Sequence, residues 1–485
     1  MHLTSLLLVL HVLLIAGFSA RVLVRNDMSS EVRMAWIAVL LLLPYLGCLL
    51  YFMFGEANIG RTVLSRHQRV RELVRAQLAD DAAAARVMGD PANIQALVAP
   101  PWQGVFSYAA SVNGFYPVAG NRGELMADGA AARARMLADF DAAQHQINVL
   151  YYIWLDDHTG TEMAEALMRA ARRGVRCRAM IDGLGSRAFA KTPLWQQMRA
   201  AGVQVAVALP INNPLKVILT SRIDLRNHLK ITLIDGRITY VGSQNCADEA
   251  FAIKAKFAPW VDIMLRLEGP LVTQMQLLFA TDWMQVTDEP LDAFAVPAQP
   301  LPGGFVAQVV GEGPTVRRRS TPQLVSTLIA NARRSVTIST PYFVPDATVL
   351  EALCAAALRG VQVRMVFPHR NDSWIVAGAS RSHYLRLLAA GVQIHEYQGG
   401  LLHAKTLTVD DEITFMGSTN LDLRSFDLNF ENNVLVEDAA VTAAVVQRQN
   451  AYMTQALPVA LAQVQAWPWW RRMWNNALAT LGPVL

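Results

Sequence analysis

The hydrophobic pattern of the chain repeats a strand–helix–strand unit. An apolar strand, a helix and a second apolar strand are predicted over residues 147–182, and the same succession is predicted over residues 336–367. In each unit a glycine (Gly174 and Gly360) follows the last helical residue, where a left-handed cap ends a helix. These repeated units predict an α/β fold with two domains, each built on a mixed β-sheet flanked by helices.

Two apolar stretches precede these units. Leu3–Val24 and Met34–Phe54 each exceed twenty residues, and at about 1.5 Å per helical residue each is long enough to cross a hydrocarbon core of about 30 Å. We therefore predict two transmembrane helices within residues 1–54. A signal peptide cleaved near Ala20 is the alternative. It is disfavoured because the first residues carry no Lys or Arg and the apolar run is longer than is usual for a signal.

Basic residues next to these stretches predict an orientation. The loop between them carries Arg25 and Arg33, whereas five arginines follow the second stretch. These five are Arg61, Arg66, Arg69, Arg71 and Arg75. Because loops rich in Lys and Arg stay in the cytoplasm, both termini and the two repeated units are predicted to be cytoplasmic.

Composition sets the remaining boundaries. Residues 55–101 form an Arg-rich and then Ala-rich helical linker, which is either a solvated connector or a segment that lies against anionic headgroups. The two repeats are predicted to occupy residues 102–300 and 301–460. Residues 461–485 contain four tryptophans and two arginines between Trp467 and Trp474, a combination typical of the lipid headgroup layer. This last segment is predicted to be an interfacial membrane contact.

Each repeat carries one copy of the phrase His-x-Lys-x4-Asp, and each copy is followed by Gly-Ser-x-Asn at the same distance. The first copy comprises His228, Lys230, Asp235, Ser243 and Asn245, and the second comprises His403, Lys405, Asp410, Ser418 and Asn420. One His near one Lys is usually an ordinary surface pair. Two copies with identical spacing favour a functional site, because the context repeats together with the motif.

The motif segments read as β-strands, in which residues two apart share a face. His228 and Lys230 therefore project together, as do His403 and Lys405. An imidazole beside an ammonium suits attack on a phosphodiester, because one group acts as nucleophile or proton donor while the other neutralises oxyanion charge. The six motif residues are the candidate catalytic set. Within that set Asp235 and Asp410 are interpreted as architectural or supporting residues, since an odd offset places them on the opposite face.

Two further pairs of polar residues accompany the motifs. Ser243, Asn245, Ser418 and Asn420 follow the small glycines and are predicted to contact phosphate or to fix their loops. Asp262 and Glu431 each open a later strand, 34 and 28 residues after the respective histidine of the same repeat. A carboxylate on the far imidazole nitrogen selects the tautomer and raises its basicity, so these two are predicted to orient the histidines. A surface acid at a strand start is the alternative reading.

The duplicated motif resembles the two HKD motifs of the phospholipase D superfamily. Three stretches, Tyr151–Trp154, Thr340–Pro345 and Asn420–Ser425, are similar to those of bacterial cardiolipin synthases, and the similarity covers nearly the whole chain. Leu229 departs from that pattern, because the family often has a basic residue there. Gly-Ser after the first motif is a second departure, since some members have Gly-Gly. The resemblance implies two phospholipase D-like domains related by a pseudo-twofold axis, with both His–Lys pairs in one cleft.

The resemblance also implies a reaction and a location. His228 would attack the phosphorus of phosphatidylglycerol, and His403 would protonate the departing glycerol. A second phosphatidylglycerol would then take the phosphatidyl group from the histidine to give cardiolipin. Pseudo-symmetry leaves the reverse assignment of the two histidines open. No metal or other cofactor is implied, and the protein is expected to be a multi-pass protein of the bacterial inner membrane.

Composition limits the alternatives. A net charge of +4 favours anionic partners, and 53% hydrophobic residues is high for a soluble enzyme, so phosphatidylglycerol, other anionic phospholipids and the membrane are the expected partners. Nucleic acid is disfavoured because Lys and Arg are not massed with aromatic residues in the catalytic half. Hydrolysis to phosphatidic acid, or transfer to another alcohol, stays open. The scattered cysteines Cys48, Cys177, Cys246 and Cys354 predict neither a zinc site nor a disulfide framework.

Overall fold

The computed structural model describes residues 2–26, 28, 30–56, 60–79, 88–213, 217, 221–222, 224–294 and 298–480. The chain forms two compact units. The first unit comprises residues 1–63 and 211–224, and the second comprises nearly all of the remainder. Several sequence predictions fall partly outside the described residues: the side chains of the first eight residues, those of Arg61 and Arg75, residues 80–87 of the predicted linker, and residues 481–485.

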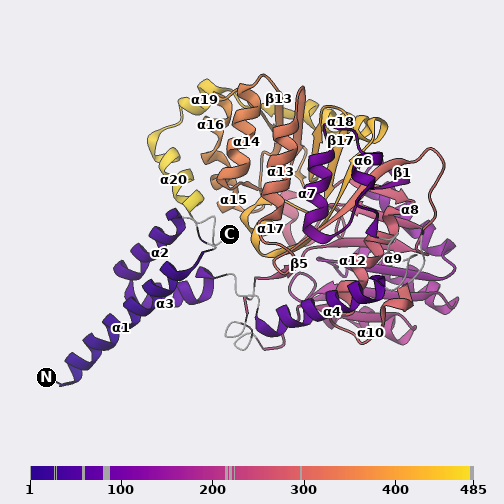
Figure 1. Cartoon of the computed structure of the whole chain (residues 1–485), viewed down its shortest axis with the longest axis horizontal. Helices are drawn as coiled ribbons and strands as arrows, with labels where there is room; N and C mark the ends of the chain where they lie inside the picture. The colour runs from indigo at the N-terminus through magenta and orange to yellow at the C-terminus, as the bar shows by residue number, and fades with distance from the viewer. Residues whose placement is uncertain are drawn as a thin grey trace. The chain divides into compact units, whose positions relative to one another are not determined.

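The first unit is built from apolar helices: α1 (His2–Val24), α2 (Ser30–Leu42), α3 (Pro44–Leu50) and a π-helical turn, η1 (Tyr51–Gly55) (Figure 1). The composition of the second apolar stretch predicts one continuous helix. The structure instead divides the stretch among α2, α3 and η1. The stretch breaks before Pro44, which begins α3 as its first residue, because proline lacks the N–H that would continue the preceding helix. Around the end of η1, Glu56 pairs with Arg21 and Arg25 and accepts a hydrogen bond from Tyr51.

Within the described part of the chain, none of the helices has both the length and the apolar character needed to span a bilayer. The two predicted transmembrane helices are thus not confirmed.

The second unit begins with α4 (Arg61–Ala79), from Leu64 onward. One face of this helix is buried: Val70 and Val74 belong to the main hydrophobic core, and the His67 ring stacks on Phe430 with centroids 5.0 Å apart. This part of the predicted linker therefore packs on the catalytic body.

The first repeat is a mixed sheet with helices on it. The parallel strands are β2 (Gln146–Tyr151), β3 (Arg176–Asp182) and β4 (Gln204–Ala208), connected through α9 (His158–Arg172) and α10 (Pro193–Ala200). The antiparallel strands are β6 (Lys230–Ile234), β7 (Ile238–Gly242) and β9 (Met264–Glu268). The helices pack on the sheet through an apolar cluster that includes Leu167 and Trp195. The predicted strand–helix–strand unit is confirmed.

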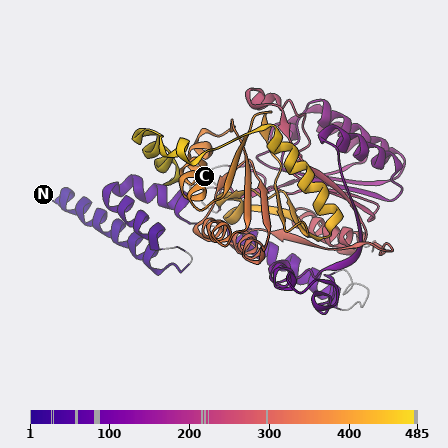
Figure 2. The same cartoon turned by 90° about the horizontal axis from the view of Figure 1, so that it is seen from above.

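The second repeat has the same arrangement. Its parallel strands are β11 (Ser335–Ser339), β13 (Gln362–Pro368) and β14 (Gln393–Tyr397), and its antiparallel strands are β16 (Thr406–Val409), β17 (Ile413–Gly417) and β19 (Asn429–Glu437). Helices α13 (Ser320–Asn331) and α14 (Ala347–Leu358) run side by side on this repeat (Figure 1). Figure 2 shows α18 (Ala439–Thr454), in yellow, lying across the strands.

The two repeats share one continuous sheet of 16 strands. The junction is β1 (Val118–Leu125), which pairs antiparallel with β9 of the first repeat and with β10 (Phe305–Glu312), the strand next to β19. Two short parallel pairs also cross between the repeats. They are β5 (Arg226–Asn227) with β19, and β8 (Trp260–Val261) with β15 (Leu401–Leu402). These two crossings lie directly beside the motif histidines.

Candidate active site

Each motif histidine lies on extended chain just before its strand, with the lysine two residues later on the same side. Lys230 Nζ donates to the His228 carbonyl oxygen at 2.9 Å, and Lys405 Nζ donates to the His403 carbonyl oxygen at 2.7 Å. All four side chains are buried. For the first pair, the His228 ring and the Lys230 ammonium also lie beside the same ring, that of Tyr152, as the sequence predicts for residues two apart on extended chain.

The carboxylates are exchanged between the repeats. His228 Nδ1 lies 2.8 Å from Glu431 Oε2, and His403 Nδ1 lies 2.6 Å from Asp262 Oδ1. Sequence order predicts that each carboxylate orients the histidine of its own repeat, and that pairing is wrong. Each repeat supplies the acid for the other repeat's histidine, so neither half of the chain holds a complete site by itself.

The short crossing strands explain the exchange. β5 pairs with the start of β19, and the His228 amide donates to the Phe430 carbonyl at 2.9 Å, which places Glu431 against the His228 ring. In the same way β15 pairs with β8, and the His403 amide donates to the Val261 carbonyl at 2.8 Å, next to Asp262. The backbone thus sets both His–carboxylate contacts.

A buried hydrogen-bond network fixes β5. The Asp182 carboxylate, at the end of β3, accepts from the Asn227 amide at 2.9 Å and faces Arg226 at 3.4 Å. Asn432 then ties the first motif to the second repeat, because its side-chain oxygen accepts from the Lys230 amide at 2.8 Å.

The serines of the Gly-Ser turns hold the carboxylates. Ser243 Oγ donates to Asp262 Oδ1 at 2.6 Å, and Ser418 Oγ donates to Glu431 Oε2 at 2.5 Å. Each Oγ also accepts the backbone N–H of the residue that follows its carboxylate. Both hydroxyls are fully buried and already hydrogen-bonded, which favours the loop-fixing alternative over a phosphate contact.

The glycines before these serines permit the close strand approach. A Cβ on Gly242 would lie 2.0 Å from the Ile263 carbonyl oxygen, and a Cβ on Gly417 would lie 2.2 Å from that of Asn432. Any side chain at these positions would push the serine away from its carboxylate.

The two asparagines of the motif occupy different surroundings. Asn245 Oδ1 accepts from the Ile153 amide at 3.3 Å, which matches the loop-fixing alternative. The Asn420 amide donates to Ser425 Oγ at 3.3 Å, while its buried side-chain oxygen has no hydrogen-bond partner among the described residues.

The motif aspartates lie at the far ends of the strands from the histidines. Both adopt positive φ values (53° and 54°) in the hairpin turns. The Asp235 carboxylate accepts three backbone N–H groups at residues 144–146, where β2 begins, and the Asp410 carboxylate accepts those at residues 333–335, where β11 begins. Each carboxylate joins a motif hairpin to the first parallel strand of its repeat, β2 or β11.

An aromatic ring packs against each motif histidine. The centroid of the Tyr152 ring lies 4.9 Å from that of the His228 ring and 5.7 Å from Lys230 Nζ. The centroids of the Trp260 and His403 rings lie 4.6 Å apart. Neither ring is among the site residues predicted from the sequence. Only their positions in the sequence could have pointed to these two rings. Tyr152 follows the strand paired with β6, and Trp260 lies two residues before Asp262.

The electrostatics keep both imidazoles neutral. Burial, together with Lys230 and Lys405, holds the pKa of His228 well below its usual value, and His403 also contributes to this effect. Burial and Lys405 lower the pKa of His403 to about 4. Burial also lowers the pKa of both lysines, that of Lys405 to about 7. Each lysine thus acts on the histidine of the other repeat, and buried cations favour an added negative charge.

The two carboxyls differ in their ionisation. Burial favours the neutral form of both. For Asp262 the opposing effects of His403 and Lys405 and a hydrogen bond from Ser243 prevail, and its pKa is lowered. For Glu431 burial prevails and its pKa is raised. The two halves of the site are therefore chemically unequal.

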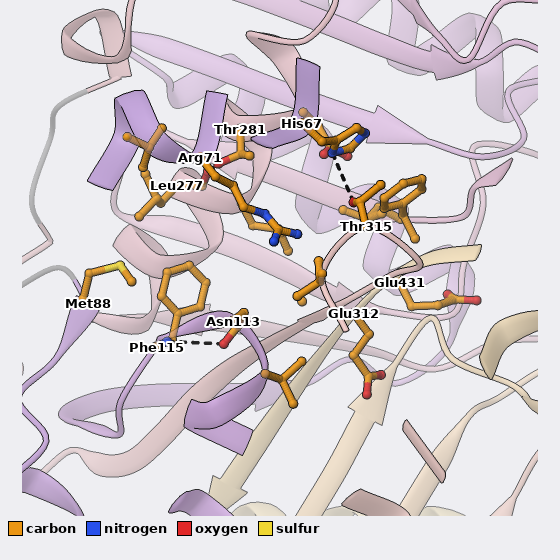
Figure 3. A pocket seen from close by; sticks show the side chains of 18 residues that line it. His67, Arg71, Met88, Asn113, Phe115, Leu277, Thr281, Glu312, Thr315 and Glu431 are labelled. Atoms are coloured by element: carbon orange, nitrogen blue, oxygen red, sulfur yellow. Dashed lines mark hydrogen bonds between the residues drawn. The ribbon is translucent and has the colours of Figure 1, made fainter. Parts of the chain in front are cut away.

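A cavity of about 90 Å³ lies behind the His228 half of the site and includes Leu229 and Glu431 in its lining. In Figure 3 the Arg71 side chain extends into it, while the carboxylates of Glu312 and Glu431 point away from it. Glu312 is buried and accepts from Asn433 Nδ2 at 3.0 Å, and burial raises its pKa to about 8. Among the described residues, no three His, Cys, Asp or Glu side chains are grouped so that they could hold a metal ion.

Comparison with known proteins agrees with this architecture. A family model described as "Cardiolipin synthase, PLD-like domain" matches residues 136–283 and 325–453, one segment in each repeat. A second model, "Phospholipase_D-nuclease N-terminal", matches residues 7–56. The fold is similar to that of a phosphatidylserine synthase from Haemophilus influenzae, with a TM-score of 0.58 over 75% of this chain and 95% of that chain at 14% identity.

The duplicated His–Lys site on one α/β sheet thus defines a protein of the phospholipase D-like class. The chain is 33% identical over 482 residues to cardiolipin synthase A of Citrobacter koseri, covering 98% of this chain and 96% of that protein. It is 34% identical over 479 residues to cardiolipin synthase A of Serratia proteamaculans, with the same coverage. The chain belongs to the family of phospholipase D-like cardiolipin synthases.

Proposed function

We propose that this protein is a phosphatidyltransferase that makes cardiolipin and glycerol from two molecules of phosphatidylglycerol through a phosphatidyl-histidine intermediate. The observation that carries the proposal is the exchanged pairing, in which each histidine is held at Nδ1 by a carboxylate from the other repeat. Because Nδ1 is occupied, Nε2 of each ring is the atom left to react. Two such rings beside two lysines provide a nucleophile and a proton donor for one phosphorus.

In the first step His228 Nε2 attacks the phosphorus of phosphatidylglycerol, and the bond from phosphorus to the glycerol oxygen breaks. His403 Nε2–H gives its proton to that oxygen, so neutral glycerol departs. Lys230 and Lys405 neutralise the phosphoryl oxygens, a role that needs no metal. The anionic diester offsets the lysine charges that disfavour protonation of His403 in the free enzyme.

In the second step a hydroxyl of another phosphatidylglycerol attacks the same phosphorus. His403 Nε2, now neutral, takes the hydroxyl proton, and the bond from phosphorus to His228 breaks. Cardiolipin departs, and both histidines regain their starting protonation states. The reaction exchanges one phosphodiester for another.

The unequal carboxyls favour this assignment of the histidines. Asp262, whose pKa is lowered, is ionised and supports a proton on His403, as an acid and base requires. Glu431 holds the Nδ1 side of His228 and so presents Nε2, the atom that a nucleophilic histidine uses. The reverse assignment would place the nucleophile beside the ionised carboxylate and the proton carrier beside the weaker one. Asp235 and Asp410 act in this scheme only through the fold.

The alternatives differ in the acceptor. Water in the second step would give phosphatidic acid, and a different alcohol would give another phospholipid. The similarity to proteins named cardiolipin synthase A over nearly the whole chain supports phosphatidylglycerol as the acceptor.

We further propose that the first unit attaches the protein to the bacterial inner membrane, with the catalytic unit on the cytoplasmic side. Large apolar side chains are exposed along α1, α2 and α3. They include Val9, Leu10, Leu13, Leu23, Met34, Leu41, Leu42, Leu46 and Leu49. Exposed apolar surface of this extent suits lipid better than water.

Product analysis by mass spectrometry tests the reaction. Purified full-length protein in phosphatidylglycerol vesicles, without any nucleotide-activated lipid, should give cardiolipin and glycerol in equal amounts. His403→Ala should abolish both products, whereas His158→Ala, at an exposed surface histidine, should leave them unchanged. Phosphatidic acid as the dominant product would replace the proposal with hydrolysis.

A further inference from the structure

A second apolar surface, away from the first unit's helices in the sequence, lies on α20 (Trp469–Thr480) and the start of α15 (Trp374–Ser382). We define the tryptophan surface by its five large exposed side chains. They are Trp374 (63% exposed), Trp469 (68%), Trp470 (57%), Met473 (59%) and Trp474 (53%). Exposed tryptophans are uncommon on soluble surfaces, and so many together indicate a contact site.

Helix packing holds this surface in place. Leu478 of α20 is buried against Gly378 of α15, where an added Cβ would lie 2.3 Å from Leu478 Cδ1. The rings of Trp374 and Trp474 stack with centroids 5.9 Å apart and an angle of 11°. The tryptophans are therefore presented by two packed helices.

The charge around the surface is positive. No acidic residue follows Asp438 in the sequence, whereas Arg471 and Arg472 lie between the tryptophans. The Arg471 guanidinium lies 4.0 Å from the Trp467 ring centroid, and Arg472 is exposed. Tryptophan and arginine together suit the headgroup layer, where the ring is half-solvated and the cation meets lipid phosphate.

The tryptophan surface adjoins the active site through Asp372, two residues before Trp374. Asp372 accepts from Tyr342 Oη at 2.7 Å and pairs with Lys254 Nζ at 2.5 Å. Tyr342 lies near Tyr152, whose ring is next to the His228 ring. Lys254 itself follows Ile253, which is 66% exposed, so the first repeat adds an apolar and basic element to the same region.

We propose that the tryptophan surface docks on the headgroup layer of an anionic bilayer and holds the active-site region against it. This contact is separate from attachment by the first unit. It applies whether the enzyme transfers or hydrolyses, because either reaction needs lipid headgroups brought to the His–Lys pairs. Its occupant is the lipid bilayer, since the rings and cations together match an interface that is both apolar and anionic.

A fluorescent label at position 473 tests this proposal in the full-length protein. Met473→Cys can be labelled selectively because Cys48, Cys177, Cys246 and Cys354 are all buried. The labelled protein is placed in vesicles of zwitterionic lipid, with or without about one third phosphatidylglycerol, and quenching by brominated acyl chains and by aqueous iodide is measured. Leu358→Cys, at an exposed apolar side chain on α14, is the matched control.

With phosphatidylglycerol present, the label at 473 should be quenched by brominated lipid at least about threefold more than the label at 358, and shielded from iodide. Adding Trp469→Ser and Trp470→Ser should reduce that quenching at least about twofold, because these rings supply most of the free apolar area. Equal iodide quenching at both positions would overturn the proposal. Shielding from iodide without lipid quenching would also overturn it, and would assign the surface to a second copy of the chain. Neither quenching measurement depends on catalysis, so the membrane-docking proposal can fail while the proposed reaction stands, and the reverse.

Discussion

At the scale of residues, the site depends on carboxylates that cross between repeats. Glu431 holds the Nδ1 side of His228 and is itself held by Ser418, Ser425 and Asn429. The neighbours of Glu431 thus occupy both of its oxygens, and the geometry leaves one orientation for the His228 ring.

We predict that Glu431→Gln lowers kcat by about 10²–10⁴-fold, because the amide can fix the wrong tautomer of His228 and carries no charge to support the transition state. The comparison is Glu437→Gln, at the other end of the same strand, where the carboxylate accepts from the Ala99 amide. Turnover of phosphatidylglycerol and thermal melting should be measured together. An unchanged kcat in a folded Glu431→Gln protein would remove Glu431 from the mechanism.

The buried carboxyl of Glu312 makes the stability of the fold depend on pH. Burial raises its pKa from 4.5 to about 8, so the folded protein binds a proton that the unfolded chain releases between these values. The stability contributed by the protonated form is therefore complete below about pH 4.5 and is lost as the pH rises through about 8.

Glu312→Gln should remove this loss. The variant should melt several degrees above the wild type at pH 8.5 and close to it at pH 5, corresponding to about 1–3 kcal/mol at the higher pH. Differential scanning fluorimetry between pH 5 and pH 8.5 measures how the melting temperature of each protein changes with pH. A variant that is destabilised equally at both pH values would show that Glu312 is ionised and paired in the folded state.

At the scale of elements, the motif aspartates organise the hairpins. The Asp410 carboxylate accepts three backbone N–H groups ahead of β11, whereas its neighbour Asp411 is 62% exposed. Loss of the first carboxylate would leave partly buried donors without an acceptor, which costs about 1–3 kcal/mol for each unsatisfied group.

Asp410→Ala is therefore expected to lower the melting temperature and the folded yield, while the folded fraction keeps kcat within about fivefold of the wild type. Asp411→Ala should change neither quantity. Denaturation curves and active-site titration separate the two effects. A stable Asp410→Ala protein with no turnover would instead show that the aspartate takes part in the chemistry.

The elements also show what the sequence could predict. The alternation in β2, β3, β11 and β13 is local, so the repeated unit and the His–Lys projection could be read from the chain. The crossing strands β5, β8 and β15 have two residues each, too few for any periodicity. The exchanged carboxylates follow from those crossings and could not be predicted. For residues 34–54 the sequence itself contained the missed signal. The prediction of one helix rested on the number of apolar residues and did not take account of the helix break at Pro44.

At the scale of the whole molecule, the repeats act as one catalytic unit. β1 joins their sheets, and each repeat provides the carboxylate for the other's histidine. This arrangement explains why both copies of the motif are needed for one site. It also makes the two copies unequal, since one histidine faces an aspartate whose pKa is lowered and the other a glutamate whose pKa is raised.

In the proposed reaction His228 carries the phosphatidyl group while His403 moves the proton. The most direct test uses a phosphatidyl donor with p-nitrophenol as leaving group, which departs without a general acid. His403→Ala should then accumulate a covalent adduct, because the base for the second step is missing. Peptide mass spectrometry should locate the phosphatidyl group on residue 228, and His228→Ala should show none. An adduct on residue 403 of the His228→Ala protein, with none on residue 228 of the His403→Ala protein, would contradict the account and reverse the two roles.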